Sequence, residues 1–118
     1  MKLVYIAGPY NADTTYARQK NIEAARDEAA VWWQKGYAVI CPHMNTANMD
    51  GVVERDVWLA GDFEIIRRCD IIVMLPGWEE SAGAREEFEV AVAHVLVIYY
   101  VSGPQVQKID EENVLDNA

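Results

Sequence analysis

WLAGDFEIIRRCDIIVMLPGWEESAGAREEFEVAVA, residues 58–93, is the stretch that decides the fold. It predicts a helix, a buried strand, a glycine-bearing loop and a second helix. This alternation is the repeating unit of a parallel α/β sheet. The strand, DIIVML at 70–75, is a continuous apolar run, which indicates a central position covered by helices on both faces.

Each helix of this stretch turns one carboxylate toward its apolar face. Residues three and four apart share a helical face, so Asp62 lies with Trp58 and Ile66, and Glu87 lies with Val90. Burying an ionised carboxylate in such an apolar stripe costs free energy unless the group is paired with a cation, hydrogen-bonded or part of a functional site. The two acids therefore indicate a catalytic or binding site. The alternative is that each acid lies at a solvated helix end or pairs with an arginine.

The rest of the chain continues the same alternation. In order, its apolar runs and capping signals predict a strand at 2–7, a helix at 15–35, a strand at 37–41, a helix at 54–68, the strand at 70–75, a helix after Ser81, a strand at 95–101 and a short extra strand at 106–109. We therefore expect one domain over residues 1–118, an α/β fold with a doubly wound, flavodoxin-like or Rossmann-like parallel sheet of four to five strands and helices on both faces. We expect the tail at 103–118 to fray or to lie at a subunit interface.

The composition, the net charge and the cysteine spacing exclude several classes of partner and site. The chain has 118 residues, 52% hydrophobic and 25% charged, as in an ordinary globular domain, and its formal charge of −9 argues against a nucleic-acid polymer as partner. The first apolar run is too short for a signal peptide or a membrane span, so we expect a cytoplasmic protein. Cys41 and Cys69 match no metal or redox spacing and predict buried free thiols. We therefore expect no metal and no cofactor.

Three loops follow predicted strands at the edge where ligands gather in doubly wound sheets, at 8–11, 42–48 and 76–83. The second is long and polar, which suits a ligand wall, although a histidine satisfied within the loop is the alternative for His43. In the third, Ser81 is the natural cap of the following helix, and its hydroxyl and the neighbouring N–H groups could also bind an anion.

Three segments together resemble the nucleoside 2-deoxyribosyltransferase superfamily, especially its short, often phage-encoded members, and are also similar to deoxynucleoside 5′-monophosphate N-glycosidases. They are VYIAGPY at 4–10, GDFEIIRRCDIIVML at 61–75 and SAGAREEFEVA at 81–91, and the resemblance covers most of residues 3–101. The last is the most specific, with a Gly followed four residues later by Glu and four later again by Ala.

The resemblance implies a role for each acid. Glu87 matches the nucleophile that attacks the anomeric carbon of the sugar, and Asp62 matches the residue that assists proton transfer around the base. The helical faces selected the same two residues independently. In the family, the loop after the first strand contacts the sugar or its 5′ group.

One departure bears on the substrate. Where the deoxyribosyltransferases usually carry an Asp six residues before the nucleophile, this chain has Ser81, as in the monophosphate hydrolases, which favours a nucleotide. Pro9 replaces a Ser of their first loop, so that phosphate site is incomplete. The candidate substrate-binding residues are Gly8, Pro9, Tyr10, Asn11, His43, Asn45, Ser81 and Gly83.

The resemblance also implies that neighbouring subunits complete the pocket, so we expect a homodimer or a larger homo-oligomer. Trp32 and Trp33 together are wider than one core stripe, and one of them is expected to meet another subunit. The small-molecule partner would be a nucleoside or nucleotide.

The predicted activity is cleavage of the N-glycosidic bond of a 2′-deoxynucleoside or its 5′-monophosphate through a glycosyl ester on Glu87, with transfer to another base or to water. This role requires a hydrogen-bond donor, Tyr5, Tyr10 or Ser81, that keeps the pKa of Glu87 near or below neutral, while desolvation should help Asp62 to hold a proton. The alternatives are a nucleotide-binding or sensing module without turnover and a purely structural flavodoxin-like subunit.

Overall fold

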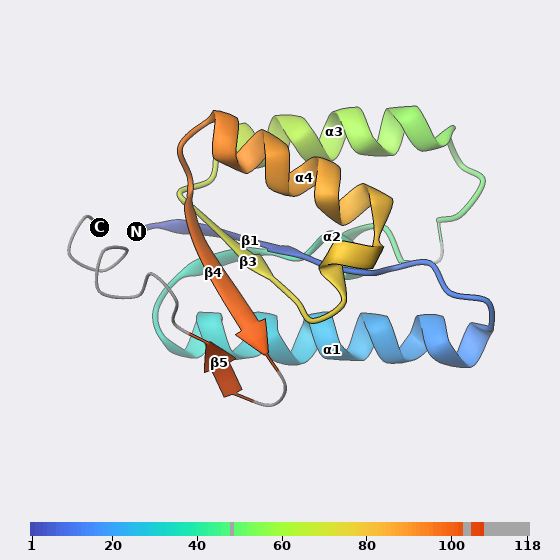
Figure 1. The fold of residues 1–118 in the computed structure, drawn as a ribbon, viewed down its shortest axis with the longest axis horizontal. Helices are drawn as coiled ribbons and strands as arrows, with labels where there is room; N and C mark the ends of the chain where they lie inside the picture. The colour runs from blue at the N-terminus through green and yellow to red at the C-terminus, as the bar shows by residue number, and fades with distance from the viewer. Residues whose placement is uncertain (48, 103–104, 108–118) are drawn as a thin grey trace.

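A five-stranded sheet forms the centre of the computed structural model, which describes residues 1–47, 49–102 and 105–107. In chain order its elements are β1 (Leu3–Ala7), α1 (Thr15–Gln34), β2 (Ala38–Ile40), α2 (Pro42–Asn45), α3 (Arg55–Arg67), β3 (Ile71–Met74), the 3₁₀ turn η1 (Trp78–Glu80), α4 (Ala82–Ala93), β4 (Val97–Ser102) and β5 (Gln105–Gln107) (Figure 1). The alternation predicted from the sequence is confirmed.

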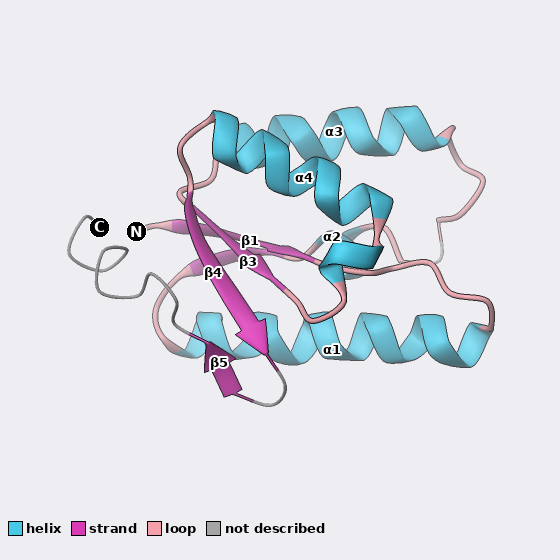
Figure 2. Ribbon diagram, viewed as in Figure 1, coloured by secondary structure: helices cyan, strands magenta, loops and turns pink. Residues whose placement is uncertain are grey.

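The strands follow the order β2-β1-β3-β4-β5, in which the first four are parallel and β5 runs antiparallel to β4 at the edge. Helix α1 covers one face of the sheet, and α3 and α4 cover the other, which gives three layers (Figure 2). This is the doubly wound, flavodoxin-like order, with its topological switch point between β1 and β3. Ligands of such sheets bind outside the carboxyl ends of the strands at this point.

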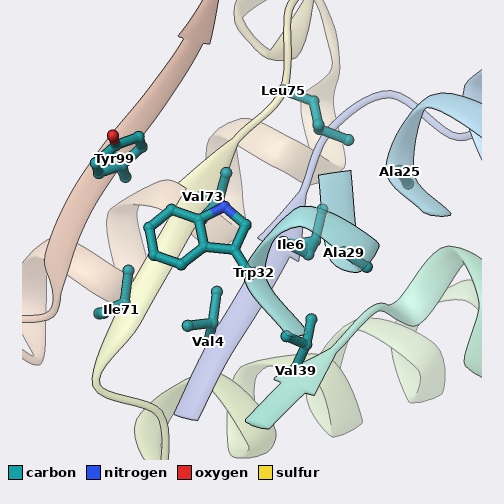
Figure 3. Close-up of a cluster of buried hydrophobic side chains, with 10 residues drawn as sticks. All are labelled: Val4, Ile6, Ala25, Ala29, Trp32, Val39, Ile71, Val73, Leu75 and Tyr99. Atoms are coloured by element: carbon teal, nitrogen blue, oxygen red, sulfur yellow. The ribbon is translucent and has the colours of Figure 1, made fainter. Parts of the chain in front are cut away.

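The two faces of β1 belong to different cores. Val4 and Ile6 face α1, where Trp32 lies across the strands and meets the ring of Tyr99 edge-on, with the ring centroids 4.9 Å apart (Figure 3). Tyr5 and Ala7 face the layer of α3 and α4 instead. Since side chains alternate along a strand, the tyrosine that follows Val4 must point toward the two helices that carry the predicted acids.

Helix boundaries follow local signals in the sequence. Thr14 Oγ1 accepts the N–H of Ala17 at 3.0 Å at the start of α1, and Ser81 Oγ accepts the N–H of Ala84 at 3.3 Å at the start of α4. The segment after Pro42, expected to be a loop, begins instead with the single-turn helix α2, because proline suits the first position of a helix. The predicted short strand at 106–109 is confirmed at residues 106 and 107, which belong to β5, whereas residues 108–109 and most of the tail at 103–118 lie outside the described residues.

Several predictions about single residues can be checked directly. Cys69 is buried, Cys41 is half-buried, and both thiols are free. Trp32 is core, whereas Trp33 leaves 55% of its surface exposed. Within the described residues, none of the helices has the length and apolarity that crossing a membrane requires.

Candidate active site

The loops that follow β1 and β3 touch each other at the switch point. Leu75 donates its N–H to the carbonyl oxygen of Ala7 at 2.8 Å, which extends the ladder between the two strands to the rim. A Cβ placed on Gly8 would lie 2.6 Å from the Cβ of Leu75, so only glycine fits there. A Cβ on Gly77 would lie 3.2 Å from the Cγ of Pro9. The first and third predicted loops therefore form one rim.

Glu87 lies on the face of α4 that packs against the sheet, and it contacts β1. The Ser81 cap sets the start of α4, and Glu87 falls in the second turn, on the face that also buries Ala84 and Ala91. Only 8% of Glu87 is exposed, and the fully buried Tyr5 donates its phenol hydrogen to Glu87 Oε2. The mostly apolar strand β1 thus supplies the hydrogen-bond donor to Glu87.

Asp62 reaches the same neighbourhood from α3. Its carboxylate is half-buried, and its negative charge raises the pKa values of both Glu87 and the Tyr5 phenol. Electrostatic coupling of this kind requires the three groups to lie close together in a poorly solvated region. The structure therefore brings the two acids of the sequence analysis to one side of the sheet, around one tyrosine.

Burial dominates the proton affinity of both acids. Desolvation raises the pKa of Glu87 from 4.5 to about 8, helped by the charges of Asp62 and Glu86, while the Tyr5 hydrogen bond lowers it. The expectation that its pKa stays near or below neutral is therefore wrong for the free protein, because one hydrogen bond does not offset the loss of water. Desolvation also raises the pKa of Asp62 from 3.8 to about 6, in the direction expected. Between these values the pair holds one proton.

Tyr10 and Ser81, the other two predicted donors, are engaged elsewhere. Ser81 Oγ caps α4. Tyr10 donates its hydroxyl to Asp50 Oδ1 at 3.4 Å, and its carbonyl oxygen accepts from the side-chain amide of Asn21 at 3.2 Å. Of the three candidates, Tyr5 is the donor that serves Glu87.

His43 supports the first loop. The imidazole is 5% exposed, its Nε2 lies 2.7 Å from the carbonyl oxygen of Pro9, and its ring meets the ring of Tyr10 edge-on with the centroids 5.5 Å apart. Burial lowers the pKa of His43, so the neutral ring donates Nε2–H to Pro9. The alternative of a histidine that bonds within the protein thus describes Nε2, whereas the buried Nδ1 has no hydrogen-bond partner among the described residues.

The remaining predicted binding residues are dispersed. Asn45 lines a hollow of about 400 Å³ with Trp33 of α1 and Cys41, and Glu87 is not part of its lining. Asn11 is exposed, and Gly83 stands against α3, because its Cβ would lie 3.9 Å from Leu59.

A second hollow of about 400 Å³ lies between α3 and α4 and is lined by Phe63, Arg67 and Val90 among others. Neither this hollow nor the one beside β2 includes Asp62 or Glu87. In the described part of the chain, neither of these two hollows therefore gives access to the two acids.

The sequence patterns did not indicate the contact between Arg18, Asp50 and Tyr10, which together form a rim cluster. Arg18 Nη1 lies 3.0 Å from Asp50 Oδ2, and the guanidinium carbon stands 5.9 Å from the centroid of the Tyr10 ring. Arg18 Nε is buried and has no hydrogen-bond partner among the described residues. Arg18 and Asp50 are 32 residues apart and belong to no motif, so no sequence spacing signals their contact.

Comparison with known proteins identifies a family and solved structures of similar fold. The family model described as "Domain of unknown function (DUF4406)" matches residues 2–100. The fold is similar to that of a solved CMP N-glycosidase of Clostridium botulinum, BcmB, with a TM-score of 0.60 and 19% identity over 84% of this chain and 70% of that chain. No curated protein matches the sequence. The structural likeness shows the fold and is consistent with the family resemblance found in the sequence.

Proposed function

Because this chain belongs to the DUF4406 family, a domain of unknown function, we infer its function from the geometry of its site. We propose that the protein cleaves N-glycosidic bonds. The substrate would be a 2′-deoxynucleoside or its 5′-monophosphate, with transfer of the sugar to another base or to water. The observation that carries the proposal is the buried Glu87 carboxyl held by Tyr5 and electrostatically coupled to Asp62. The fold shared with a protein named as a CMP N-glycosidase supports it.

The proposed reaction needs one nucleophile and one acid, and the pair holds one proton at neutral pH. In the free protein that proton resides on Glu87, whose pKa is the higher of the two. When substrate binds, the proton passes to Asp62, and Asp62 delivers it to the departing base. The Glu87 oxygen then bonds to the anomeric carbon as the bond from that carbon to the base nitrogen breaks, and the electron pair leaves with the base.

The second half-reaction reverses the first. Water or an incoming base attacks the anomeric carbon and displaces the Glu87 carboxylate, while Asp62 takes the proton that the attacking group loses. Two displacements at one carbon retain its configuration. Tyr5 acts as a positioning residue, since its phenol fixes one oxygen of Glu87 and leaves the other for the substrate.

Base release from a panel of deoxynucleosides and their 5′-monophosphates tests this proposal. We expect free base, and a glycosyl mass adduct that Glu87→Ala lacks, with a loss of several orders of magnitude in rate. Glu89→Ala, on the exposed side of the same helix, is the matched control and should retain activity. Full activity of Glu87→Ala would remove Glu87 from the mechanism.

The pH profile gives a second test. Activity should be highest between about pH 6 and pH 8, since below this range Asp62 cannot accept a proton and above it neither acid holds one. A rate that keeps rising to pH 10 would contradict the one-proton arrangement.

A binding or sensing module without turnover is the second candidate function. The raised pKa of Glu87 favours it, because a protonated carboxyl is a poor nucleophile. This reading predicts tight nucleotide binding without free base, and binding that survives Asp62→Asn. Calorimetric titration beside the base-release assay separates the two functions.

We further infer a single domain over residues 1–118 that works in the cytoplasm as a homodimer or larger assembly. The exposed Trp33 supports self-association, since large apolar side chains of this exposure often mark interfaces. Sedimentation velocity measures the assembly directly, and a monomer at all concentrations would contradict it.

A further inference from the structure

We propose that Arg18 binds the 5′-phosphate of a nucleotide substrate, at the position that the Asp50 carboxylate occupies in the free protein. The inference rests on the proposed function and specifies its substrate class as a nucleoside 5′-monophosphate. It starts from the rim cluster of Arg18, Asp50 and Tyr10.

Arg18 uses little of its hydrogen-bonding capacity. A guanidinium offers five donors in a planar fork that suits two oxygens of a carboxylate or phosphate. Arg18 makes one contact of this kind, from Nη1 to Asp50 Oδ2 at 3.0 Å, and its buried Nε has no acceptor among the described residues. Because buried donors are nearly always satisfied in native proteins, the Nε–H of Arg18 is available to an acceptor from outside the described residues, such as a ligand oxygen.

The guanidinium is also held in place before a ligand arrives. Arg18 projects from the first turn of α1, and the centroid of the Tyr10 ring lies 5.9 Å from its guanidinium carbon. Tyr10 is in turn fixed by His43 and by Asn21. A cation that is fixed in this way loses little side-chain entropy when it binds an anion.

Asp50 is suited to leave when an anion arrives. Its side chain is 58% exposed, it lies in the segment between α2 and α3, and it contacts Arg18 and Tyr10. An exposed ion pair contributes little to stability, so exchanging the carboxylate for a phosphate costs the fold little. The phosphate would accept from both Nε and an Nη of Arg18, which Asp50 does not do.

The location suits a nucleotide that crosses the rim. Tyr10 follows Gly8 and Pro9, whose loop contacts the loop after β3 at the switch point. Arg18 belongs to α1 and Glu87 to α4, the helices that cover opposite faces of the sheet (Figure 2). A nucleotide that spans the carboxyl ends of β1 and β3 would place its sugar toward Glu87 and its phosphate toward Arg18. Arg18 would then compensate for Pro9, which offers no hydroxyl to a phosphate.

Calorimetric binding in a Glu87→Gln background tests the proposal without consuming the ligand. A deoxynucleoside 5′-monophosphate should bind at least tenfold more tightly than the same deoxynucleoside, and Arg18→Gln should abolish that preference. Asp50→Asn should strengthen monophosphate binding several-fold, since it removes both the competitor and its repulsion. Lys20→Gln removes the same charge two residues away and is the matched control, which should keep the preference.

Equal binding of monophosphate and nucleoside, or full monophosphate affinity in Arg18→Gln, would overturn the inference. If Arg18→Gln does not fold, Asp50→Asn decides, and unchanged or weaker monophosphate binding there counts against the proposal. Inorganic phosphate is titrated in parallel: saturable binding that depends on Arg18 supports the anion site even if no base is ever released. Base release from nucleosides and monophosphates at equal kcat/KM would leave the glycosidic function intact and refute Arg18 alone.

Discussion

Replacing the buried Glu87 by Gln should make the protein more stable at alkaline pH while it removes the proposed nucleophile. The pKa of Glu87 rises from 4.5 to about 8 on folding, so the folded protein holds this proton more tightly than the unfolded chain. The stabilisation is fully present below pH 4.5 and is lost as the pH rises through 8. At 1.36 kcal/mol per pKa unit, the complete loss is on the order of 5 kcal/mol.

The window from pH 7 to pH 9 isolates this group, because Asp62 is already ionised there. Across it, the free energy of unfolding of the wild-type protein should fall by about 1.4 kcal/mol through Glu87 alone. Glu87→Gln should lack this decrease and should exceed the wild type in stability at pH 9. The difference should shrink toward pH 5, where the wild-type carboxyl is protonated as well.

Urea denaturation at fixed pH values measures this dependence. Glu89→Gln, which changes an exposed carboxyl on the same helix, controls for the altered net charge and should keep the wild-type slope. Parallel curves for wild type and Glu87→Gln between pH 7 and pH 9 would refute the reasoning, since they would mean that Glu87 is already ionised in the folded protein.

Three further changes probe other features. Tyr5→Phe removes the hydrogen bond that lowers the pKa of Glu87, so carbon NMR of that carboxyl should show titration at a higher pH, and an unmoved midpoint would contradict the assigned bond. Gly8→Ala should cost about 1–3 kcal/mol in thermal denaturation because its Cβ meets the neighbouring strand end, whereas Gly61→Ala, in open space within α3, should gain about 0.5–1 kcal/mol. Val95→Gly should stabilise by up to about 1 kcal/mol, since Val95 is exposed at φ 59°, and a loss of stability would show that its side chain has a packing role.

Hydrophobic patterning and glycine positions were sufficient to predict the architecture. The run 70–75 identified a central strand, the pairs of helices and strands around it fixed a parallel sheet, and the helical faces singled out Asp62 and Glu87. These signals are local, because each depends on a period of two or 3.6 residues within one element. The short helix after Pro42 was missed because a polar, asparagine-containing segment carries no such period.

Long-range chemistry could not be predicted in the same way. Tyr5 was one of three possible donors to Glu87, and no spacing could choose among them, because the contact spans 82 positions. The pKa of Glu87 depends on how completely α3 and α4 exclude water, which no single segment encodes. The contact between Arg18 and Asp50 joins two exposed-looking residues across a loop. In each case the three-dimensional packing, rather than any spacing, determines the chemistry.

Tyr5, the hydrogen-bond donor to Glu87, lies in the middle of β1, and this position has an evolutionary consequence. A mutation of Tyr5 changes both the packing of the core and the hydrogen bond to Glu87. Natural selection for a stable fold therefore also preserves the environment of the Glu87 carboxyl. Diversification is freer at the rim, where the loops after β1 and β3 can drift without disturbing that pairing. A directed-evolution library for new specificities should therefore vary those loops and keep the strand constant.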